Sequence, residues 1–303
     1  MPSLLATPHA LRDNAKETVR GIVVVAVAYV FMTASDVAAK WALTSGVAAV
    51  MLGRGIAGSL TIIALARLEG DLRRLLPVRW GLVLARSALH TGVSIAWYMA
   101  WQVVPLADAY AVGFAAPLLM TLLAVPMLGE RIHWRRMLST LLGFSGVLVM
   151  VQPGSALWHP VVLILLPGVA GIAVSRIMTR QLSTTETAEC LTFWLMLAHI
   201  PAGLLLLGAG FPGIGSPGWD VWVALALVGI LNSTAHWLMA RAYALAPVSA
   251  LSPYEYTMLA WGGLAGWVIF HEVPGWRTLA GAGIVAAAGL YNLHRERIRR
   301  GSV

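Results

Sequence analysis

The sequence predicts an all-α integral membrane protein in which ten transmembrane helices form two inverted five-helix repeats around a central cavity. Three observations predict it: the composition, the recurrence of apolar segments of bilayer length, and an internal similarity. Of the 303 residues, 59% are hydrophobic and only 11% are charged, whereas soluble domains carry about 25% charged residues. The mean hydropathy of +0.78 agrees with a chain that lies mostly in lipid.

The apolar segments have the length of membrane-spanning helices. A hydrocarbon core of about 30 Å needs roughly 20 helical residues, and continuous apolar runs exclude barrel strands, in which apolar and polar residues alternate. Breaks at proline, glycine and charged clusters delimit the helices. They are predicted at residues 21–43, 46–67, 79–103, 106–128, 134–151, 158–180, 186–208, 218–245, 248–270 and 276–294.

In the first half of the chain, charges and one proline separate the helices. The first helix follows Arg20, the second ends at Arg67 and the third begins at Arg79. Pro105 separates the third from the fourth, because the residue before a proline is disfavoured in a helix. A basic cluster at 131–136 then separates the fourth helix from the fifth.

In the second half, turn-forming residues make the breaks. The sixth helix follows the Pro153–Gly154 turn, and the polar run 183–187 separates it from the seventh. A glycine- and proline-rich stretch at 208–218 comes before the eighth, Pro247 before the ninth, and the Pro274–Gly275 turn before the tenth.

Basic residues concentrate in alternate loops, which predicts the orientation. Lysine and arginine favour the cytoplasmic side, so both termini are predicted to be cytoplasmic in a multi-pass protein of the bacterial inner (plasma) membrane. The net charge of +8 is then a topology signal, and it does not indicate nucleic-acid binding. The cytoplasmic set is Arg12, Lys16, Arg20, Arg67, Arg73, Arg74, Arg79, Arg131, Arg135, Arg136, Arg295, Arg297, Arg299 and Arg300, and the opposite loops hold mainly Lys40 and Arg277.

An internal repeat divides the chain into residues 1–151 and 152–303. A shift of 142 residues aligns a short set of scarce residues: Ala100 with Ala242, Pro105 with Pro247, Glu130 with Glu272, Trp134 with Trp276 and Arg135 with Arg277. Five helices in each half are an odd number, so the halves enter the membrane from opposite sides. Inverted repeats of this kind place a substrate site between the halves near the midplane, which indicates transport.

These residues give the chain a resemblance to a known family, the EamA type of the drug/metabolite transporter superfamily. The resemblance rests on the two prolines that open the fourth helix of each half. It also rests on the Leu-Gly-Glu-Arg and Phe-His-Glu ends of those helices near Glu130 and Glu272, each followed by Trp-Arg. More narrowly, the chain resembles bacterial YddG-type amino-acid exporters. The resemblance implies a central cavity, outward passage of neutral metabolites or amino acids, and alternating access.

Two stripes of polar and aromatic residues are the candidate cavity walls. In the third helix they recur every three or four residues, on one face, and the 142-residue shift places a second stripe on the eighth helix. The residues are His90, Ser94, Trp97 and Trp101 in one stripe and Asn232, His236 and Tyr243 in the other. An interfacial aromatic belt is the alternative for the tryptophans, and bonds to neighbouring helices are the alternative for the histidines.

The fourth and ninth helices add Tyr110, Ser252 and Tyr256 to the predicted cavity. Aromatic walls with a few polar anchors suit a ligand of amino-acid size. Plain helix packing is an equal alternative for the two tyrosines. Pro105 and Pro247 mark fixed bends at equivalent places and are predicted hinges.

Buried charges are the candidates for coupling or pairing because a charge in hydrocarbon is costly. Asp36 and Glu255 can carry protons, and Glu255 is the preferred candidate. Arg54 is predicted to pair with Asp36, with binding of a substrate carboxylate as the alternative. Arg86 and Arg176 are predicted to reach the membrane surface, and Arg241 to bind Glu255 or a helix terminus.

The sequence therefore predicts a monomeric inner-membrane exporter of aromatic and other neutral amino acids, or of similar metabolites, by alternating access. The alternatives are a proton-coupled drug exporter and, less favoured, a polytopic membrane enzyme. No signature of a metalloprotease, an aspartate-rich magnesium site or a serine nucleophile occurs. We expect no catalysis, no cofactor, no metal site and no nucleic-acid partner. The expected partners are a small-molecule substrate and membrane lipids.

Overall fold

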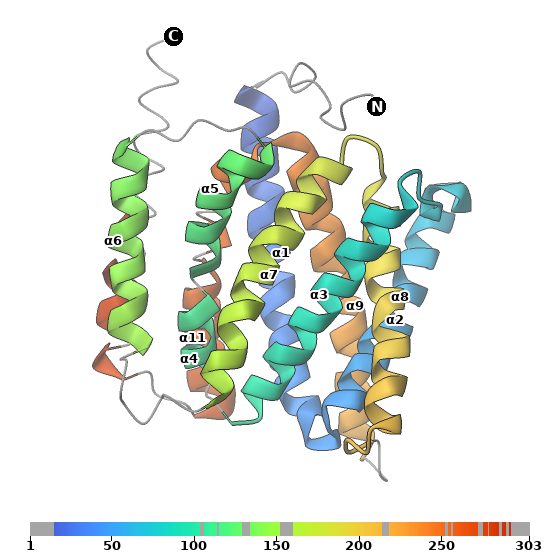
Figure 1. Cartoon of the computed structure of the whole chain (residues 1–303). Coiled ribbons are helices and arrows are strands. Elements are labelled where there is room, and N and C mark those ends of the chain that lie inside the picture. Colours follow the sequence, from blue (N-terminus) through green and yellow to red (C-terminus); the bar gives the residue numbers. More distant parts are fainter. Residues whose placement is uncertain are drawn as a thin grey trace.

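Helices that run up and down one common axis make up the computed structural model of the chain (Figure 1). It describes residues 15–103, 106–113, 115–128, 134–151, 160–213, 218–251, 254–255, 257–271, 275–277, 279–284, 287–288 and 291. Within these ranges the chain forms helices joined by turns and loops, and no strand.

The observed helices follow the predicted segments within a few residues at most ends. The first observed helix starts earlier than predicted, at Ala15. The segments predicted at 106–128 and 248–270 each contain two described helices. The bounds are α1 Ala15–Ala42, η2 Leu43–Ser45, α2 Val47–Leu68, η3 Leu72–Leu75, α3 Trp80–Trp101, α4 Leu106–Gly113, α5 Ala115–Leu128, α6 Trp134–Val151, α7 Pro160–Leu182, α8 Ala188–Gly208, α9 Trp219–Leu245, α10 Val248–Leu251 and α11 Thr257–Phe270. Residues 276–277, 279–284, 287–288 and 291 are also helical.

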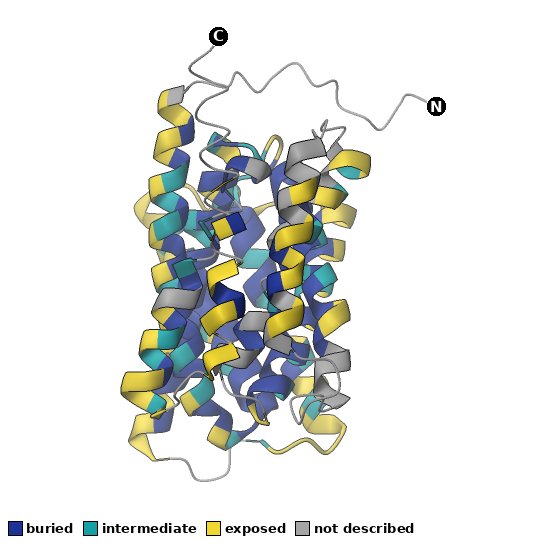
Figure 2. Cartoon of the chain, turned by 90° about the vertical axis from the view of Figure 1, so that its left-hand side faces the viewer, coloured by how far each residue is buried: buried dark blue, intermediate teal, exposed yellow. Residues whose placement is uncertain are grey.

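The surface of the bundle is apolar and its interior contains polar residues. Figure 2 shows exposed residues along the outer sides of the helices and buried residues between them. Leu205 is 74% exposed and Leu60 is 61% exposed, whereas Arg54 is 4% exposed. Such an apolar outer surface suits a hydrocarbon solvent, in which backbone groups must be paired within helices.

Four of the described helices are long and apolar enough to cross a membrane. They are the spans Lys16–Ser45, Val47–Leu68, Ala188–Gly208 and Trp219–Leu245.

Helices from the two halves of the chain pack against one another. α1 packs along α9, α2 packs against α8 and α9, and α3 packs along α7. The approach of α2 to α9 depends on glycine: a Cβ atom on Gly229 would lie 2.6 Å from the backbone nitrogen of Gly58. Small residues at such crossings let helix backbones come together. The polar side chains on these helices are thereby held in the centre.

Candidate functional site

A pocket lies between α1, α2, α3, α4, α7 and α9, and one of its walls is aromatic. Trp97, Tyr98 and Trp101 come from the last turns of α3, and Tyr110 comes from α4. The centroids of the Trp97 and Trp101 rings are 5.9 Å apart, and Trp101 and Tyr110 meet edge to face at 6.5 Å. Such rings supply a large apolar area on which a planar ligand can stack.

The polar wall comes from the middle of α3 and the middle of α9. His90 meets His236 edge to face, with ring centroids 4.8 Å apart. Nδ1 of His90 lies 3.1 Å from the Ser175 hydroxyl, and the Ser94 hydroxyl donates to the His90 carbonyl at 2.9 Å. Asn232 donates to the Ser35 hydroxyl at 3.2 Å. The two predicted stripes therefore face each other across the pocket.

Arg54 reaches the polar wall from α2. Its Nη1 donates to the Ser94 hydroxyl at 2.9 Å and to the Tyr98 hydroxyl at 3.0 Å. Its Nη2 lies 3.3 Å from Nε2 of His236. A guanidinium only donates, so the His236 nitrogen accepts in this contact. All three partners are uncharged groups.

Asp36 lines the same pocket from α1. The Tyr110 hydroxyl donates to its Oδ2 at 2.7 Å, and the residue is 8% exposed. The predicted pairing with Arg54 does not occur: within the described part of the chain, no ion pair joins the two residues. Each side chain instead binds hydroxyl groups on α3 or α4.

Arg176 and Glu255 form a buried ion pair and line the same pocket. Arg176 also donates to the Tyr29 hydroxyl at 3.0 Å. The expectation that Arg176 extends to the membrane surface was wrong, because this carboxylate lies within its reach inside the bundle. Glu255 is paired and belongs to the pocket lining, as does Arg176.

Two other arginines also differ from the expectation. Arg86 is buried and donates to the Thr179 hydroxyl at 2.7 Å and to the Leu191 carbonyl at 3.0 Å. These acceptors on α7 and α8 replace contact with the membrane surface. Arg241 pairs with Glu69 at 3.5 Å rather than with Glu255.

Some polar atoms of the pocket residues are buried and have no hydrogen-bond partner among the described residues. They are Nε of Arg54, the indole nitrogens of Trp97 and Trp101, and Oδ1 of Asn232. Buried polar atoms in native proteins are nearly always paired. Three donors and one acceptor on pocket residues are nevertheless unpaired within the described part of the chain.

Most of the predicted site residues meet in this pocket. The lining contains Asp36, Arg54, His90, Ser94, Trp97, Trp101, Tyr110, Asn232, His236 and Glu255. Tyr243 does not line it: the residue is fully buried, and its backbone carbonyl accepts from Arg180. Pro247 lies between α9 and α10, where its carbonyl accepts from the Ala250 amide at 3.0 Å. Ser252, Tyr256 and Pro105 lie outside the described residues.

The sequence prediction missed three polar residues around this site. Tyr98 follows Ser94 by one helical turn, so the stripe periodicity could have identified it. Ser175 and His199 gave no such signal, yet His199 on α8 is fully buried and its Nε2 lies 3.2 Å from the Ser94 hydroxyl. Their positions depend on how α7 and α8 pack against α3.

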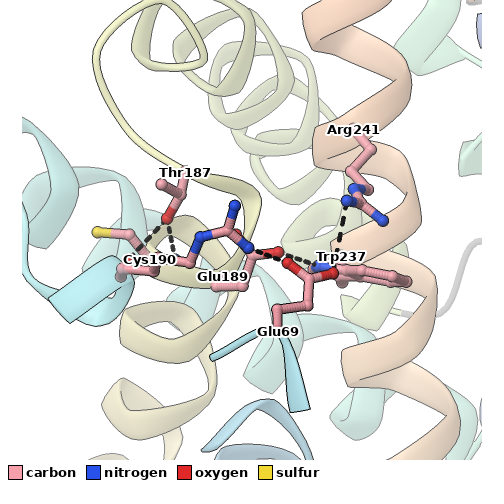
Figure 3. A network of polar contacts seen from close by, with 7 residues as sticks. Glu69, Thr187, Glu189, Cys190, Trp237 and Arg241 are labelled. Atoms are coloured by element: carbon pink, nitrogen blue, oxygen red, sulfur yellow. Dashed lines mark hydrogen bonds and ion pairs between the residues drawn. The ribbon is translucent and has the colours of Figure 1, made fainter. Parts of the chain in front are cut away.

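A second polar cluster lies where α2 ends and α8 begins, and we call it the end cluster (Figure 3). The Trp237 indole donates to Oε1 of Glu189 at 2.8 Å, and the Arg241 guanidinium lies over the Trp237 ring. Arg241 and Arg74 both pair with Glu69. These contacts join the ends of α2 and α9 to the first turn of α8.

Thr187 completes the end cluster. Its hydroxyl caps α8 by accepting from the Cys190 amide at 3.0 Å, and it donates to the Arg74 carbonyl at 2.6 Å. An N-cap of this kind satisfies one of the free amides at the start of a helix. Through its bond to Arg74, the same hydroxyl links the start of α8 to η3.

Comparison with known proteins gives two consecutive matches to one family model. The model is described as the EamA-like transporter family, and it matches residues 19–152 and residues 159–292. The pocket draws its lining from both matched segments.

Several characterised proteins are similar in sequence. A riboflavin transporter of Rhizobium johnstonii is 31% identical over 210 residues, which are 67% of each chain. A riboflavin transporter of Brucella anthropi is 28% identical over 87% of this chain and 94% of its own. An S-adenosylmethionine uptake transporter of Rickettsia prowazekii is 27% identical over 66% of this chain and 67% of its own.

A solved crystal structure has the same fold. It superposes with a TM-score of 0.70 at 16% sequence identity and covers 96% of this chain and 100% of its own. At this identity the likeness concerns the fold alone.

Proposed function

The chain belongs to the EamA-like transporter family, and from this premise we propose that it carries a small metabolite with a planar aromatic group across the bacterial inner membrane by alternating access. The observation that carries this proposal is the pocket itself. It has an aromatic wall on α3 and α4 and a polar wall shared by α3 and α9. Rings provide stacking area, and a few convergent polar groups orient the ligand.

The substrates named for the relatives support a planar ring. Riboflavin and S-adenosylmethionine both contain a fused heteroaromatic system, and tryptophan contains an indole. The relatives are named for riboflavin transport and for S-adenosylmethionine uptake, so they favour neither amino acids nor export. We therefore propose an aromatic metabolite, with aromatic amino acids among the candidates, that moves in the direction of its gradient.

The helix contacts support two inverted five-helix repeats, residues 1–151 and 152–303, in a ten-helix monomer. Under the shift of 142 residues, α7 corresponds to α1 and α9 to α3. The contact of α1 with α9 then corresponds to the contact of α7 with α3, and both are extensive. An inverted pair of repeats can rock about a site between them. In this arrangement both termini are cytoplasmic, and Pro105 and Pro247 are hinges.

A proton-coupled exporter is the second candidate, and Asp36 is the observation that favours it. This buried carboxylate accepts one hydrogen bond from Tyr110, and within the described residues it has no ion-pair partner. A carboxylate in such a place can bind and release a proton as access alternates. Glu255 is less suited because Arg176 pairs with it.

Substrate exchange in proteoliposomes tests the proposal. Purified protein is reconstituted with labelled tryptophan, riboflavin or S-adenosylmethionine on one side, each with and without a pH gradient. We expect exchange of at least one compound in both directions, with the compound recovered unchanged. If no compound is exchanged by protein that shows a cooperative thermal transition, the proposal is wrong. Accumulation only with a pH gradient favours the second candidate, and a chemically altered product indicates a membrane enzyme.

A further inference from the structure

We infer that the pocket recognises a zwitterion, with Arg54 binding a substrate carboxylate and Asp36 binding a substrate ammonium group. This inference rests on the proposed function, because it assigns the substrate class to the same pocket. Both charges line one cavity, and no direct ion pair joins these two described residues.

Arg54 is a buried cation whose hydrogen-bond partners are all uncharged. It donates to two hydroxyls and to one imidazole nitrogen, and its Nε has no partner among the described residues. A cation in hydrocarbon is costly unless an anion compensates it. The remaining N–H and the planar shape of the guanidinium suit a carboxylate.

Asp36 is the corresponding anion on α1. It is 8% exposed, and its described hydrogen bond comes from the Tyr110 hydroxyl. An ionised carboxylate offers about four acceptor sites, so capacity remains for an ammonium group. Among the described residues, neither an arginine nor a lysine forms an ion pair with it.

The Arg176–Glu255 pair in the same pocket provides an internal contrast. These two charges bind each other directly and compensate each other without a ligand. The remaining formal charges of the pocket are one guanidinium and one carboxylate, held apart on α2 and α1. A zwitterion carries both charges and compensates each of the two residues. A ligand without charged groups compensates neither, and a singly charged ligand compensates only one.

The aromatic wall defines the rest of the substrate. Trp97 and Trp101 line the same pocket as the charged groups, and their indole nitrogens have no partner among the described residues. A substrate with an α-amino acid group at one end and an aromatic ring at the other satisfies both parts of the pocket. Tryptophan and S-adenosylmethionine have this form, and riboflavin lacks the amino acid group.

A matched set of ligands tests the inference on the unmodified protein. Exchange of labelled tryptophan in proteoliposomes is inhibited with tryptophan, with tryptamine, which lacks the carboxylate, and with indole-3-propionate, which lacks the ammonium group. A parallel set compares S-adenosylhomocysteine, a thioether with the amino acid group, with 5′-methylthioadenosine, a thioether that lacks it. We expect the complete zwitterion to bind about tenfold or more tightly than each truncated form, as the loss of one charged hydrogen bond implies.

Two substitutions assign the two charges. In Asp36→Asn, the preference for tryptophan over indole-3-propionate should disappear, because the ammonium no longer finds an anion. In Arg54→Gln, the preference for tryptophan over tryptamine should disappear. In Arg54→Lys, part of this preference should remain. The controls Asp71→Asn and Arg67→Gln change exposed residues outside the pocket and should leave both preferences unchanged.

The outcomes separate this inference from the proposed function. If riboflavin is exchanged and neither tryptophan nor S-adenosylmethionine is, the inference fails and the proposed function stands. Equal binding of tryptophan, tryptamine and indole-3-propionate also overturns it. If the protein is folded and exchanges none of the compounds, both proposals fail. Because the ligand set is measured on the wild-type protein, the result does not depend on whether the variants fold.

Discussion

The rings of His90 and His236 meet edge to face with their centroids 4.8 Å apart. This contact joins the middle of α3 to the middle of α9, and so connects the two segments that match the family model. Arg54 binds His236 directly and reaches Ser94, one turn from His90. The centre of the bundle is therefore a polar layer surrounded by apolar helix faces.

Removal of one aromatic ring from the pocket should weaken substrate binding. Trp101 is 6% exposed and lines the pocket beside Tyr98 and Tyr110. In Trp101→Ala we expect the half-saturation concentration for exchange to rise by about tenfold, since such a ring contributes roughly 1.5 kcal/mol beyond its area. Exchange kinetics in proteoliposomes measure this change.

The matched control for that change is Trp267→Ala. Trp267 belongs to α11 and is 59% exposed on the outer surface. The Trp267→Ala substitution should leave the half-saturation concentration for exchange unchanged. Equal effects of the two substitutions would indicate that loss of a tryptophan acts through general packing and would move the binding site elsewhere.

Replacement of His90 should reduce transport and leave the fold intact. His90 contacts Ser175 and His236, both within the polar wall. In His90→Ala we expect the exchange rate to fall by about tenfold, the size expected when the pocket loses one polar contact of roughly 1.5 kcal/mol to the substrate. Size-exclusion profiles and the thermal midpoint should match those of the wild type. An unchanged rate would contradict a role for this wall.

Neutralising one partner of the buried Arg176–Glu255 ion pair should destabilise the protein more than neutralising both partners. Glu255→Gln leaves the Arg176 cation without its carboxylate, which costs about 3–5 kcal/mol in buried pairs. The double variant Arg176→Gln/Glu255→Gln has no unpaired charge and should recover much of that loss. Thermal unfolding in detergent compares the three proteins. A double variant that is no more stable than Glu255→Gln would show that the pair does not act as a unit.

The crossing of α2 and α9 should not tolerate a side chain at Gly229. A Cβ atom there would lie 2.5 Å from the Ala57 Cβ and 2.6 Å from the Gly58 nitrogen. In Gly229→Ala we expect a loss of about 1–3 kcal/mol from overpacking, measured as a lower thermal midpoint. Gly92→Ala is the control, because a Cβ atom at Gly92 meets no atom within 4 Å. If both variants melt alike, the helices can separate at low cost.

Cys190 should report on opening at the end cluster. It is the one cysteine of the chain and is fully buried beside Thr187 and Glu186. We expect slow labelling by a water-soluble maleimide in the wild type and faster labelling in Arg241→Gln, which loses the contact with Glu69. The exposed Arg241–Glu69 ion pair itself should contribute at most about 1 kcal/mol to the stability of the protein. An unchanged labelling rate would mean that the Arg241–Glu69 contact does not shield Cys190 at the end cluster.

The sequence predicted the helices well because hydrophobic length and turn residues act locally. The loops near Arg67, Arg79 and Pro247 separate the observed helices at nearly the predicted places. The family resemblance, drawn from the repeated proline and glutamate positions, is confirmed by the two family matches. Stripe periodicity also selected residues that meet in one pocket, since a helix brings every third or fourth residue onto one face.

The partners of the charged residues could not be read from the sequence. Arg54 and Asp36 lie on adjacent helices, and pairing was predicted from the cost of burying a charge. Their actual partners, Ser94, Tyr98 and Tyr110, depend on how α3 and α4 pack against α1 and α2. Arg176 likewise finds Glu255 through tertiary packing, which no local pattern reveals.

The packing of α1 along α9 has a consequence for how the chain is made. Ribosomes deliver α1 and α2 to the membrane long before α9, so Ser35 and Arg54 enter the lipid without Asn232 and His236, their partners on the later helix. We therefore expect the early helices to stay at the insertion machinery, or shielded by water and lipid headgroups, until α9 is made. A chain that stops before α9 should be recognised as unfinished and degraded by membrane proteases, because its polar faces remain open to lipid.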